Sequence, residues 1–247
     1  MISPGSIQFW NGHKKMLIFI CGVITILAGA LDARSQELKD DMLAIQKVFS
    51  SDKIHEFIIK YKYFDNDKPG VVRDSLEGDI VVQNQNYYYK IGGSELVKNN
   101  KHFLRISKLK KYIAVYPPDY VKANSQPFEI IDSVYRSNGI DMKKIRDKDG
   151  RKTYEVKFAK GDLSYFQFTF NSTTYFPEEI IYQFGDKSKF RADLGKSPRL
   201  EIHLVPVHPK QSGNLFSDST YLRESAGALE LAAAYKNYKL INPLSKQ

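Results

Sequence analysis

The sequence predicts a mainly β protein of the α+β class: a strongly curved antiparallel sheet that forms an unclosed β-barrel with a few covering helices. Many short segments alternate apolar and polar residues with the period of two typical of strands. Only two segments show a clear helical pattern, and about eight or nine strands with a shared apolar face are too wide for two short helices to cover. A barrel or sandwich that closes on a packed core is the alternative.

The N-terminal segment has the pattern of a secretory signal peptide. Residues 16–30 form an apolar run that follows Lys14 and Lys15, and small residues precede Gln36 at Ala33 and Ser35. The run is shorter than the roughly 20 residues that cross a bilayer. We therefore predict a signal peptide over residues 1–35, cleavage after Ser35 and a periplasmic location, with an uncleaved membrane anchor as the alternative. Cleavage removes Cys21, the only cysteine, so the exported protein has no disulfide bond.

The charge of the chain is basic but dispersed. The formal net charge is +9, and the densest short cluster is Lys108, Lys110 and Lys111, with no aromatic stacking motif beside it. Nucleic-acid-binding proteins usually concentrate basic residues on one face. We therefore expect no nucleic acid partner, and peripheral contact with anionic membrane headgroups stays open.

The first half of the exported chain begins with a helix and continues with strands. A helix is predicted over residues 36–50, where apolar residues recur every three or four positions. Alternation and turn residues then predict strands over residues 57–63, 76–82, 87–91, 103–106 and 112–116. A second helix is predicted over residues 127–136, with Pro127 early in the helix and Gly139 beyond its end.

The second half is predicted to contain further strands. They cover residues 154–158, a hairpin within residues 162–186, and residues 200–204. Polar loops are expected over residues 186–198 and 208–219, and residues 220–242 suit a helix in one part and a strand in another. No internal repeat or linker divides the chain, so residues 36–247 are predicted to form one half-barrel domain.

The hairpin places its large apolar residues on one side. Its turn, Asn171–Thr174, is rich in residues that bond their own backbone. The side chains on the apolar side are Phe166, Phe168, Phe170, Ile180, Tyr182 and Phe184. Together these six side chains carry more apolar surface than the few hundred Å² that a monomer usually leaves exposed to water. We predict that they bind lipid, together with residues that face them across the sheet: Phe57, Ile59 and Tyr61.

The order of elements resembles a known family. The stretches YYYKIGGSE, RISKLKKYIAVYPPD and SYFQFTFN…YFPEEIIYQF, within residues 40–242, are similar in pattern to the periplasmic lipoprotein carrier and receptor family (LolA/LolB-like), particularly the Bacteroidota type. The resemblance implies an unclosed barrel with a helical lid and an apolar cavity that takes acyl chains of lipids or lipoproteins. The arginine associated with lid closure in that family has no clear counterpart here.

The sequence offers no set of residues for catalysis. His203 and His208 are interpreted as ordinary histidines at a strand end, because no third metal ligand is visible. Glu178 and Glu179 are adjacent and are expected to point to opposite faces of a strand, so they are poor partners for acid–base chemistry. We therefore predict no enzymatic activity, no cofactor and no metal site.

Two functions from different classes follow. The first is a periplasmic carrier or chaperone that shields the acyl chains of a lipid or lipoprotein in an apolar half-barrel cavity. The second is a non-enzymatic accessory protein of a cell-envelope assembly, with a packed β core and an envelope protein as its partner.

The signal-peptide pattern yields the first testable prediction. Protein recovered from the periplasm of expressing cells should begin at Gln36, because the small residues before it fit a signal peptidase. N-terminal sequencing measures this directly. An intact Met1 terminus in the membrane fraction would contradict it.

Overall fold

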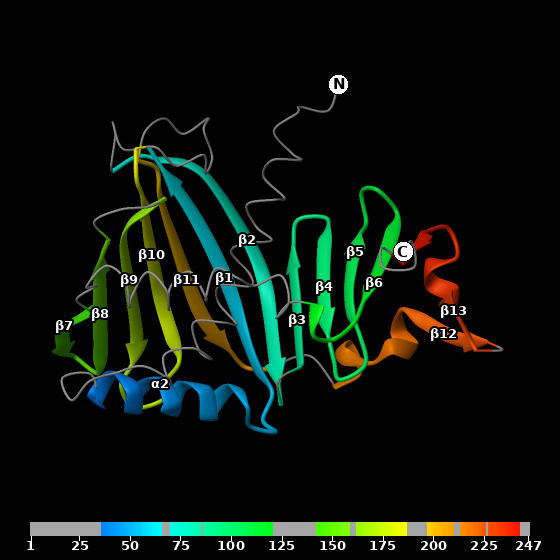
Figure 1. Ribbon diagram of the computed structural model, residues 1–247, viewed down its shortest axis with the longest axis horizontal. Helices are drawn as coiled ribbons and strands as arrows, with labels where there is room; N and C mark the ends of the chain where they lie inside the picture. Colours follow the sequence, from blue (N-terminus) through cyan, green and yellow to red (C-terminus); the bar gives the residue numbers. More distant parts are fainter. Residues whose placement is uncertain are drawn as a thin grey trace. The chain divides into compact units, whose positions relative to one another are not determined.

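The fold is mainly β, with an open, curved antiparallel sheet (Figure 1). The computed structural model describes residues 36–65, 70–84, 86–120, 142–158, 162–186, 197–209, 213–225 and 227–242. Within these residues the strand order is β14-β6-β5-β4-β3-β2-β1-β11-β10-β9-β8-β7, so the sheet has two ends and is not closed into a barrel. The predicted fold class is confirmed.

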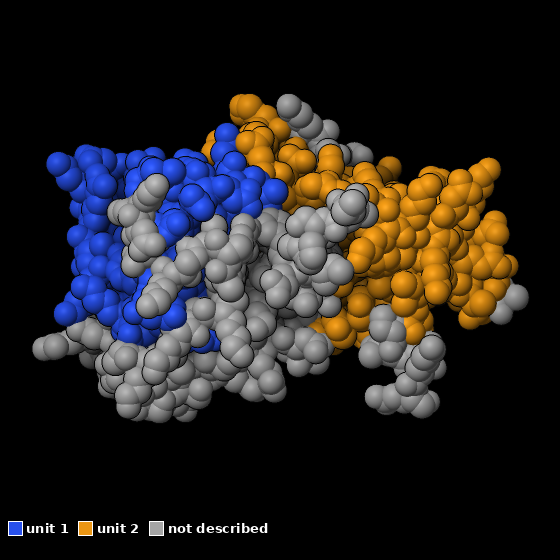
Figure 2. All heavy atoms as spheres, turned by 90° about the horizontal axis from the view of Figure 1, so that it is seen from above, with its two compact units in different colours: residues 1–48, 60–76, 125–204 blue, residues 49–59, 77–124, 205–247 orange. Residues whose placement is uncertain are grey.

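The chain divides into two compact units, shown in different colours in Figure 2. Unit 1 comprises residues 1–48, 60–76 and 125–204, and unit 2 comprises residues 49–59, 77–124 and 205–247. Strands β1 (His55–Phe64) and β2 (Val72–Gln83) contribute residues to both units. A single domain over residues 36–247 stays a prediction.

Unit 1 combines most of helix α2 with a set of antiparallel strands. The helix covers Gln36–Phe49, close to the predicted range, and buries Met42 and Ile45. The strands β7 to β11 follow one another in space as they do in sequence. Their bounds are β7 Met142–Lys148, β8 Arg151–Lys157, β9 Leu163–Asn171, β10 Pro177–Phe184 and β11 Arg199–Val207.

The predicted hairpin is confirmed as β9 and β10. Asn171 organises its turn, because its Oδ1 accepts hydrogen bonds from the backbone N–H groups of Thr173 at 3.0 Å and Thr174 at 2.9 Å. The backbone N–H of Tyr175 also donates to the carbonyl oxygen of Asn171 at 2.9 Å. The register, which sequence reasoning left open, pairs Phe168 with Ile180.

Unit 2 contains a meander of short antiparallel strands. They are β3 Asn86–Ile91, β4 Ser94–Lys98, β5 Phe103–Ser107 and β6 Tyr112–Tyr116. One face of this meander, with Val81 of β2, forms a buried core that includes Tyr88, Val97, Leu104 and Ile113. Strand β14 (Lys239–Ile241) pairs with β6 in parallel and extends the meander.

The C-terminal segment covers that core. Phe216, Tyr221 and Leu222 are buried in it, and Leu231 and Tyr235 pack against it. This segment is neither a continuous helix nor a long strand, the two alternatives considered for residues 220–242. It consists of three 3₁₀ helices (Gly213–Phe216, Asp218–Thr220, Ala233–Tyr235), the short strands β12 (Leu222–Ser225) and β13 (Ala228–Leu231), and β14.

Tyrosines that contact one another characterise this covering segment: Tyr221 is buried, and Tyr235 and Tyr238 are partly buried. The ring centroids of Tyr221 and Tyr235 are 5.7 Å apart, and those of Tyr235 and Tyr238 are 5.1 Å apart in an edge-on arrangement. Burial, with the nearby carboxylate of Glu95, raises the pKa of Tyr235 to about 12. The Tyr235 phenol is therefore neutral at physiological pH and packs against the core.

Asn99, between β4 and β5, joins the meander to the C-terminal segment. Its Nδ2 donates to the carbonyl oxygen of Phe216 at 2.8 Å and to Oδ1 of Asp218 at 2.6 Å. Its Oδ1 accepts from the backbone N–H groups of Lys101 and His102, both at 2.8 Å. One buried amide thus satisfies groups that are far apart in sequence.

Several expectations need correction or fall outside the described residues. Strands β4 and β7 were not predicted. The predicted polar loop over residues 208–219 contains one 3₁₀ helix with the buried Phe216 and the beginning of a second, Asp218–Thr220. The signal peptide over residues 1–35 and the helix over residues 127–136 lie outside the described residues. Among the helices that are described, none has the length and apolar character of a membrane span.

The contacts of Asn99 yield a prediction. Asn99→Ala should lower the free energy of unfolding by about 2–4 kcal/mol, because it leaves several buried polar groups without partners. Urea unfolding followed by circular dichroism measures the change. Asn237→Ala, at an exposed position in the same unit, is the control and should have little effect. Equal stabilities for the two variants would contradict the role assigned to Asn99.

Candidate functional site

The apolar face of unit 1 is the first candidate site. Cross-strand pairing aligns one row of side chains from Tyr154 through Phe168 and Ile180 to Ile202. A second row runs from Val156 through Phe166 and Tyr182 to Leu200. We call this surface the apolar face and define it by these residues with Phe170: Tyr154, Val156, Phe166, Phe168, Phe170, Ile180, Tyr182, Leu200 and Ile202.

Aromatic rings hold the apolar face together. The ring centroids of Phe166 and Tyr182 are 5.3 Å apart, and those of Phe168 and Phe170 are 5.6 Å apart. Tyr154 stacks on Phe170 with a centroid separation of 6.1 Å. Such pairs add roughly 0.5–1.5 kcal/mol beyond the burial of their surface. Every residue of the apolar face is at most 7% exposed, so the face is closed to water in this structure.

The predicted lipid-binding residues are distributed over both units. The six hairpin residues and Tyr61 belong to unit 1, whereas Phe57 and Ile59 belong to unit 2. Phe184 is half-buried, beyond an irregularity in the pairing of β10 with β9, and its ring lies 6.4 Å from that of Tyr182. The structure thus brings five hairpin residues into the apolar face, with Phe184 beside them, and their position opposite β1 stays a prediction.

Sequence reasoning missed part of this surface. Tyr154, Val156, Leu200 and Ile202 belong to strands that were predicted, but they were not assigned to the site. They show the same alternation as the hairpin, so this signal was present in the sequence. Their register against the hairpin depends on long-range pairing, which alternation alone does not determine.

Helix α2 is attached to the apolar face by a cluster of polar contacts. Asp41, which is 4% exposed, accepts a hydrogen bond from the Tyr154 hydroxyl at 2.6 Å. It also accepts bonds from Lys152 Nζ at 2.9 and 3.1 Å. Near the start of the helix, Glu37 accepts a hydrogen bond from Lys144 Nζ at 2.6 Å. These contacts fix the helix over the strands β7 and β8.

The electrostatics of the cluster follow from its partners. Partial burial of Lys152 lowers its pKa, but the hydrogen bond and charge of Asp41 outweigh this effect, so the pKa is raised overall. Burial, and then the hydrogen bond to Asp41, raise the pKa of Tyr154 well above that of free tyrosine. The hydrogen bond from Lys144 lowers the pKa of Glu37. At neutral pH the cluster therefore contains charged lysines and a neutral phenol.

Unit 2 carries a second aromatic cluster. Tyr87, Phe103 and Tyr116 lie on the face of the meander opposite the core described above, and each is at most 8% exposed. The rings of Tyr116 and Tyr120 stack with centroids 4.0 Å apart, and those of Phe103 and Tyr116 are 5.8 Å apart. Sequence reasoning placed Tyr87, Phe103 and Tyr116 in strands but assigned them no role.

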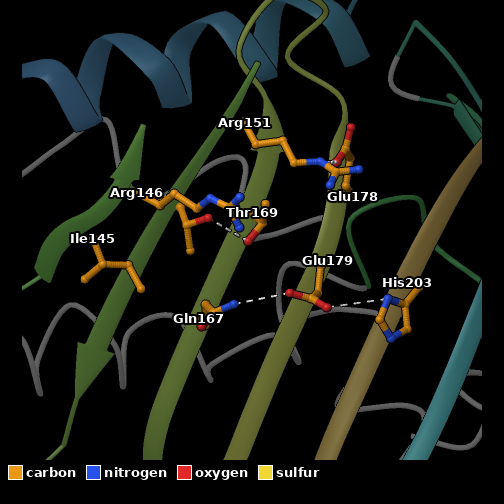
Figure 3. A pocket seen from close by; sticks show the side chains of 9 residues that line it. Ile145, Arg146, Arg151, Gln167, Thr169, Glu178, Glu179 and His203 are labelled. Atoms are coloured by element: carbon orange, nitrogen blue, oxygen red, sulfur yellow. Dashed lines mark hydrogen bonds and ion pairs between the residues drawn. The ribbon is translucent and has the colours of Figure 1, made fainter. Parts of the chain in front are cut away.

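The opposite, polar face of unit 1 contains a hollow of about 480 Å³ (Figure 3). Strands β7 to β11 contribute its walls. Its lining residues are Ile145, Arg146, Arg151, Thr153, Gln167, Thr169, Glu178, Glu179 and His203. We call it the polar hollow.

The expectation that Glu178 and Glu179 point to opposite faces is wrong. A β-bulge between Pro177 and Glu179 interrupts the alternation, so both glutamates line the polar hollow. Glu178 accepts a hydrogen bond from Arg151 Nε at 2.5 Å, and Glu179 accepts one from Gln167 Nε2 at 3.2 Å.

His203 lies within β11 and faces this hollow, whereas His208 follows the strand. The Nδ1 of His203 is 3.6 Å from Glu179, and its Nε2 is 3.3 Å from Glu201. The hydroxyls of Thr153 and Thr169 bond each other at 3.0 Å. These side chains therefore satisfy one another as cross-strand pairs. Among the described residues no group of His, Cys, Asp and Glu has the arrangement of a metal site.

Comparisons with known proteins find only distant similarity. No protein-family model and no curated protein matches the chain. A conserved protein of Thermus thermophilus is 8% identical with a TM-score of 0.48, over 84% of this chain and 99% of that one. A LolA superfamily protein of Nitrosomonas europaea is 8% identical with a TM-score of 0.31, and the match covers 76% of this chain and 98% of that one. LprF of Mycobacterium bovis is 14% identical with a TM-score of 0.32, and the match covers 75% of this chain and 100% of that one. At these identities and TM-scores the comparisons carry no argument about function.

The attachment of α2 yields a prediction. Lys152→Met should lower the free energy of unfolding by about 3–5 kcal/mol, because it leaves the buried Asp41 carboxylate without its countercharge. Arg223→Met breaks the exposed pair with Glu230 and is the control, with an expected change below about 1 kcal/mol. Denaturant unfolding measures both. Similar losses in the two variants would show that the Asp41 cluster does not anchor the helix.

The pH dependence of the same pair has a defined sign. The folded-state pKa of Lys152 is raised above the ordinary value of 10.5, so its stabilisation is complete below that pH and is lost as the pH rises through the folded-state pKa. The stability difference between the parent and Lys152→Met should therefore shrink at strongly alkaline pH.

Proposed function

We propose that the protein is a periplasmic carrier or chaperone that shields the acyl chains of a lipid or lipoprotein on the apolar face. The observation that carries this proposal is the continuous run of aromatic and aliphatic side chains across β8 to β11, with a helix attached to it by polar contacts. The signal-peptide pattern over residues 1–35 supports export, and the resemblance to lipoprotein carriers suggests the class of ligand.

The energetics of such a site are favourable. Each methylene removed from water contributes about 0.8 kcal/mol, so a chain of about ten gains roughly 8 kcal/mol before the costs of ordering and of lost motion. Several kcal/mol would remain, which suits reversible carriage. No polar anchor for a headgroup is required by this estimate.

Access to the apolar face requires a movement. Because its residues are at most 7% exposed, an acyl chain reaches them only when the elements that cover them are displaced. Helix α2 is the described element attached there, and the Asp41–Lys152 pair is its charged contact with the sheet. We propose that this pair sets the cost of opening. Reversible opening of a helix on a preformed sheet fits a carrier that both takes up and releases its ligand.

The second candidate function is an accessory protein of an envelope assembly. The same low exposure favours it, because a face that is closed to water is also what a permanently packed core shows. In that case an envelope protein is the partner, and the apolar face only stabilises the fold. Neither candidate is an enzyme: the residues of the polar hollow satisfy one another, and we propose that they are structural.

Phe168, in the centre of the apolar face and 2% exposed, distinguishes the two candidates. The carrier proposal predicts that the parent binds a fluorescent fatty acid and that Phe168→Asn weakens this binding about tenfold or more, because a polar amide replaces apolar contact surface. Fluorescence titration measures the affinity, and thermal unfolding measures stability in parallel.

Matched variants keep this experiment interpretable. Phe168→Leu retains an apolar side chain and should fold even where Phe168→Asn does not, with an intermediate affinity. Gln167→Ala, one residue earlier on the polar face, and His203→Ala should leave binding unchanged, since neither is on the apolar face. A parent protein that binds no fatty acid, combined with lost stability in Phe168→Asn, would leave the accessory-protein function in its place.

A further inference from the structure

The turn between β5 and β6 presents an exposed leucine among lysines. Leu109 is 73% exposed, more than any other large apolar side chain in the described residues. Lys108, Lys110 and Lys111 surround it in the turn and are exposed. The backbone N–H of Lys239 donates to the carbonyl oxygen of Lys111 at 2.8 Å, which brings a fourth exposed lysine beside them. We call Lys108, Leu109, Lys110, Lys111 and Lys239 the basic tip.

Several contacts hold the basic tip in place. The backbone N–H of Lys108 donates to the carbonyl oxygen of Gly93 in the neighbouring β3–β4 turn at 2.8 Å. The hydroxyl of Ser107 accepts a hydrogen bond from the backbone N–H of Lys110 at 3.2 Å. Lys111 adopts a left-handed backbone conformation with φ of 49°, which closes the turn. The exposure of Leu109 therefore belongs to an ordered turn.

The charges of the basic tip are mostly uncompensated. Lys108 Nζ lies 2.5 Å from Glu95, whose side chain is 6% exposed and thus contributes little negative charge to the surface. Within the described part of the chain, the side chains of Lys110, Lys111 and Lys239 form no ion pair. An apolar side chain among cations is complementary to a surface that is anionic outside and apolar beneath.

We propose that the basic tip docks on an anionic lipid bilayer, with Leu109 inserted among the acyl chains and the lysines at the phosphate level. Lysine side chains reach from a shallow apolar position to the headgroups, so this arrangement satisfies both kinds of side chain. A small projecting turn with one apolar residue also lacks the roughly 800 Å² per partner and the aromatic anchors of a stable protein interface. This surface is separate from the apolar face, so the inference does not depend on the proposed carrier function.

Vesicle binding tests the proposal. The protein is expressed as the full chain, purified from the periplasm and sedimented with vesicles of pure phosphatidylcholine or of equal parts phosphatidylcholine and phosphatidylglycerol. We expect binding to the mixed vesicles only, and weaker binding as salt rises. The double variant Lys110→Gln with Lys111→Gln should bind the mixed vesicles about 25-fold more weakly, because each lysine contributes about fivefold to the affinity. Leu109→Ser should weaken it by about tenfold.

Control variants change the same chemistry elsewhere. Lys148→Gln with Lys157→Gln removes two exposed lysines of unit 1, and Ile145→Ser removes an apolar side chain that is 49% exposed. Both should bind the mixed vesicles like the parent. Circular dichroism confirms that each variant is folded, and Lys108 is left unchanged because of its contact with Glu95.

Three results would overturn the proposal. Equal weakening by both lysine pairs would show a diffuse charge effect without a docking site. Equal binding of all variants to neutral vesicles would assign membrane contact to another apolar segment. A parent that binds neither kind of vesicle, but forms a complex with an acidic envelope protein that the tip variants lose, would assign the basic tip to a protein partner.

Discussion

The structure depends on the covering of a wide apolar sheet. Strands β8 to β11 align two rows of large side chains across unit 1, and the hydrophobic effect penalises any exposure of that surface to water. The helix α2 contributes Met42 and Ile45 as buried apolar residues and Asp41 as a polar contact. The opposite face of the same strands carries charges that pair across strands, as between Arg151 and Glu178, and this keeps the two faces chemically distinct.

The apolar faces in the two units are covered by different interactions. In unit 2 the C-terminal segment covers the meander with tyrosines and aliphatic residues. Asn99 binds this segment through hydrogen bonds to the carbonyl oxygen of Phe216 and the carboxylate of Asp218. In unit 1 the helix is attached through a nearly buried carboxylate with a lysine and a phenol. A buried ion pair is costly to break on one side and gains little over apolar packing. Displacing the helix instead returns both charged groups to water together, so on the proposed account ligand binding offsets a cost smaller than that of removing one partner.

Much of the fold could be predicted from the sequence, because alternation and turn residues act locally. The helix that begins at Gln36, the β9–β10 hairpin and its turn at Asn171 all follow from patterns within a few residues. Strand β7 escaped prediction because its sequence, MKKIRDK, is mostly charged. Strand β4 was missed because its apolar residues Leu96 and Val97 are adjacent and do not alternate with polar ones. The polar hollow was missed because the bulge near Glu178 breaks the alternation, and the Asp41–Lys152 contact because it joins residues distant in sequence.

The central claim is that acyl chains occupy the apolar face, and native mass spectrometry of the protein purified from its own periplasm tests it most directly. The carrier account predicts a second species whose added mass equals that of a lipid or an acylated peptide, and which is lost on extraction with organic solvent. If gentle ionisation yields only the bare polypeptide, although the source cells contain abundant protein and intact lipids, the result would contradict that account and favour a packed core with a protein partner.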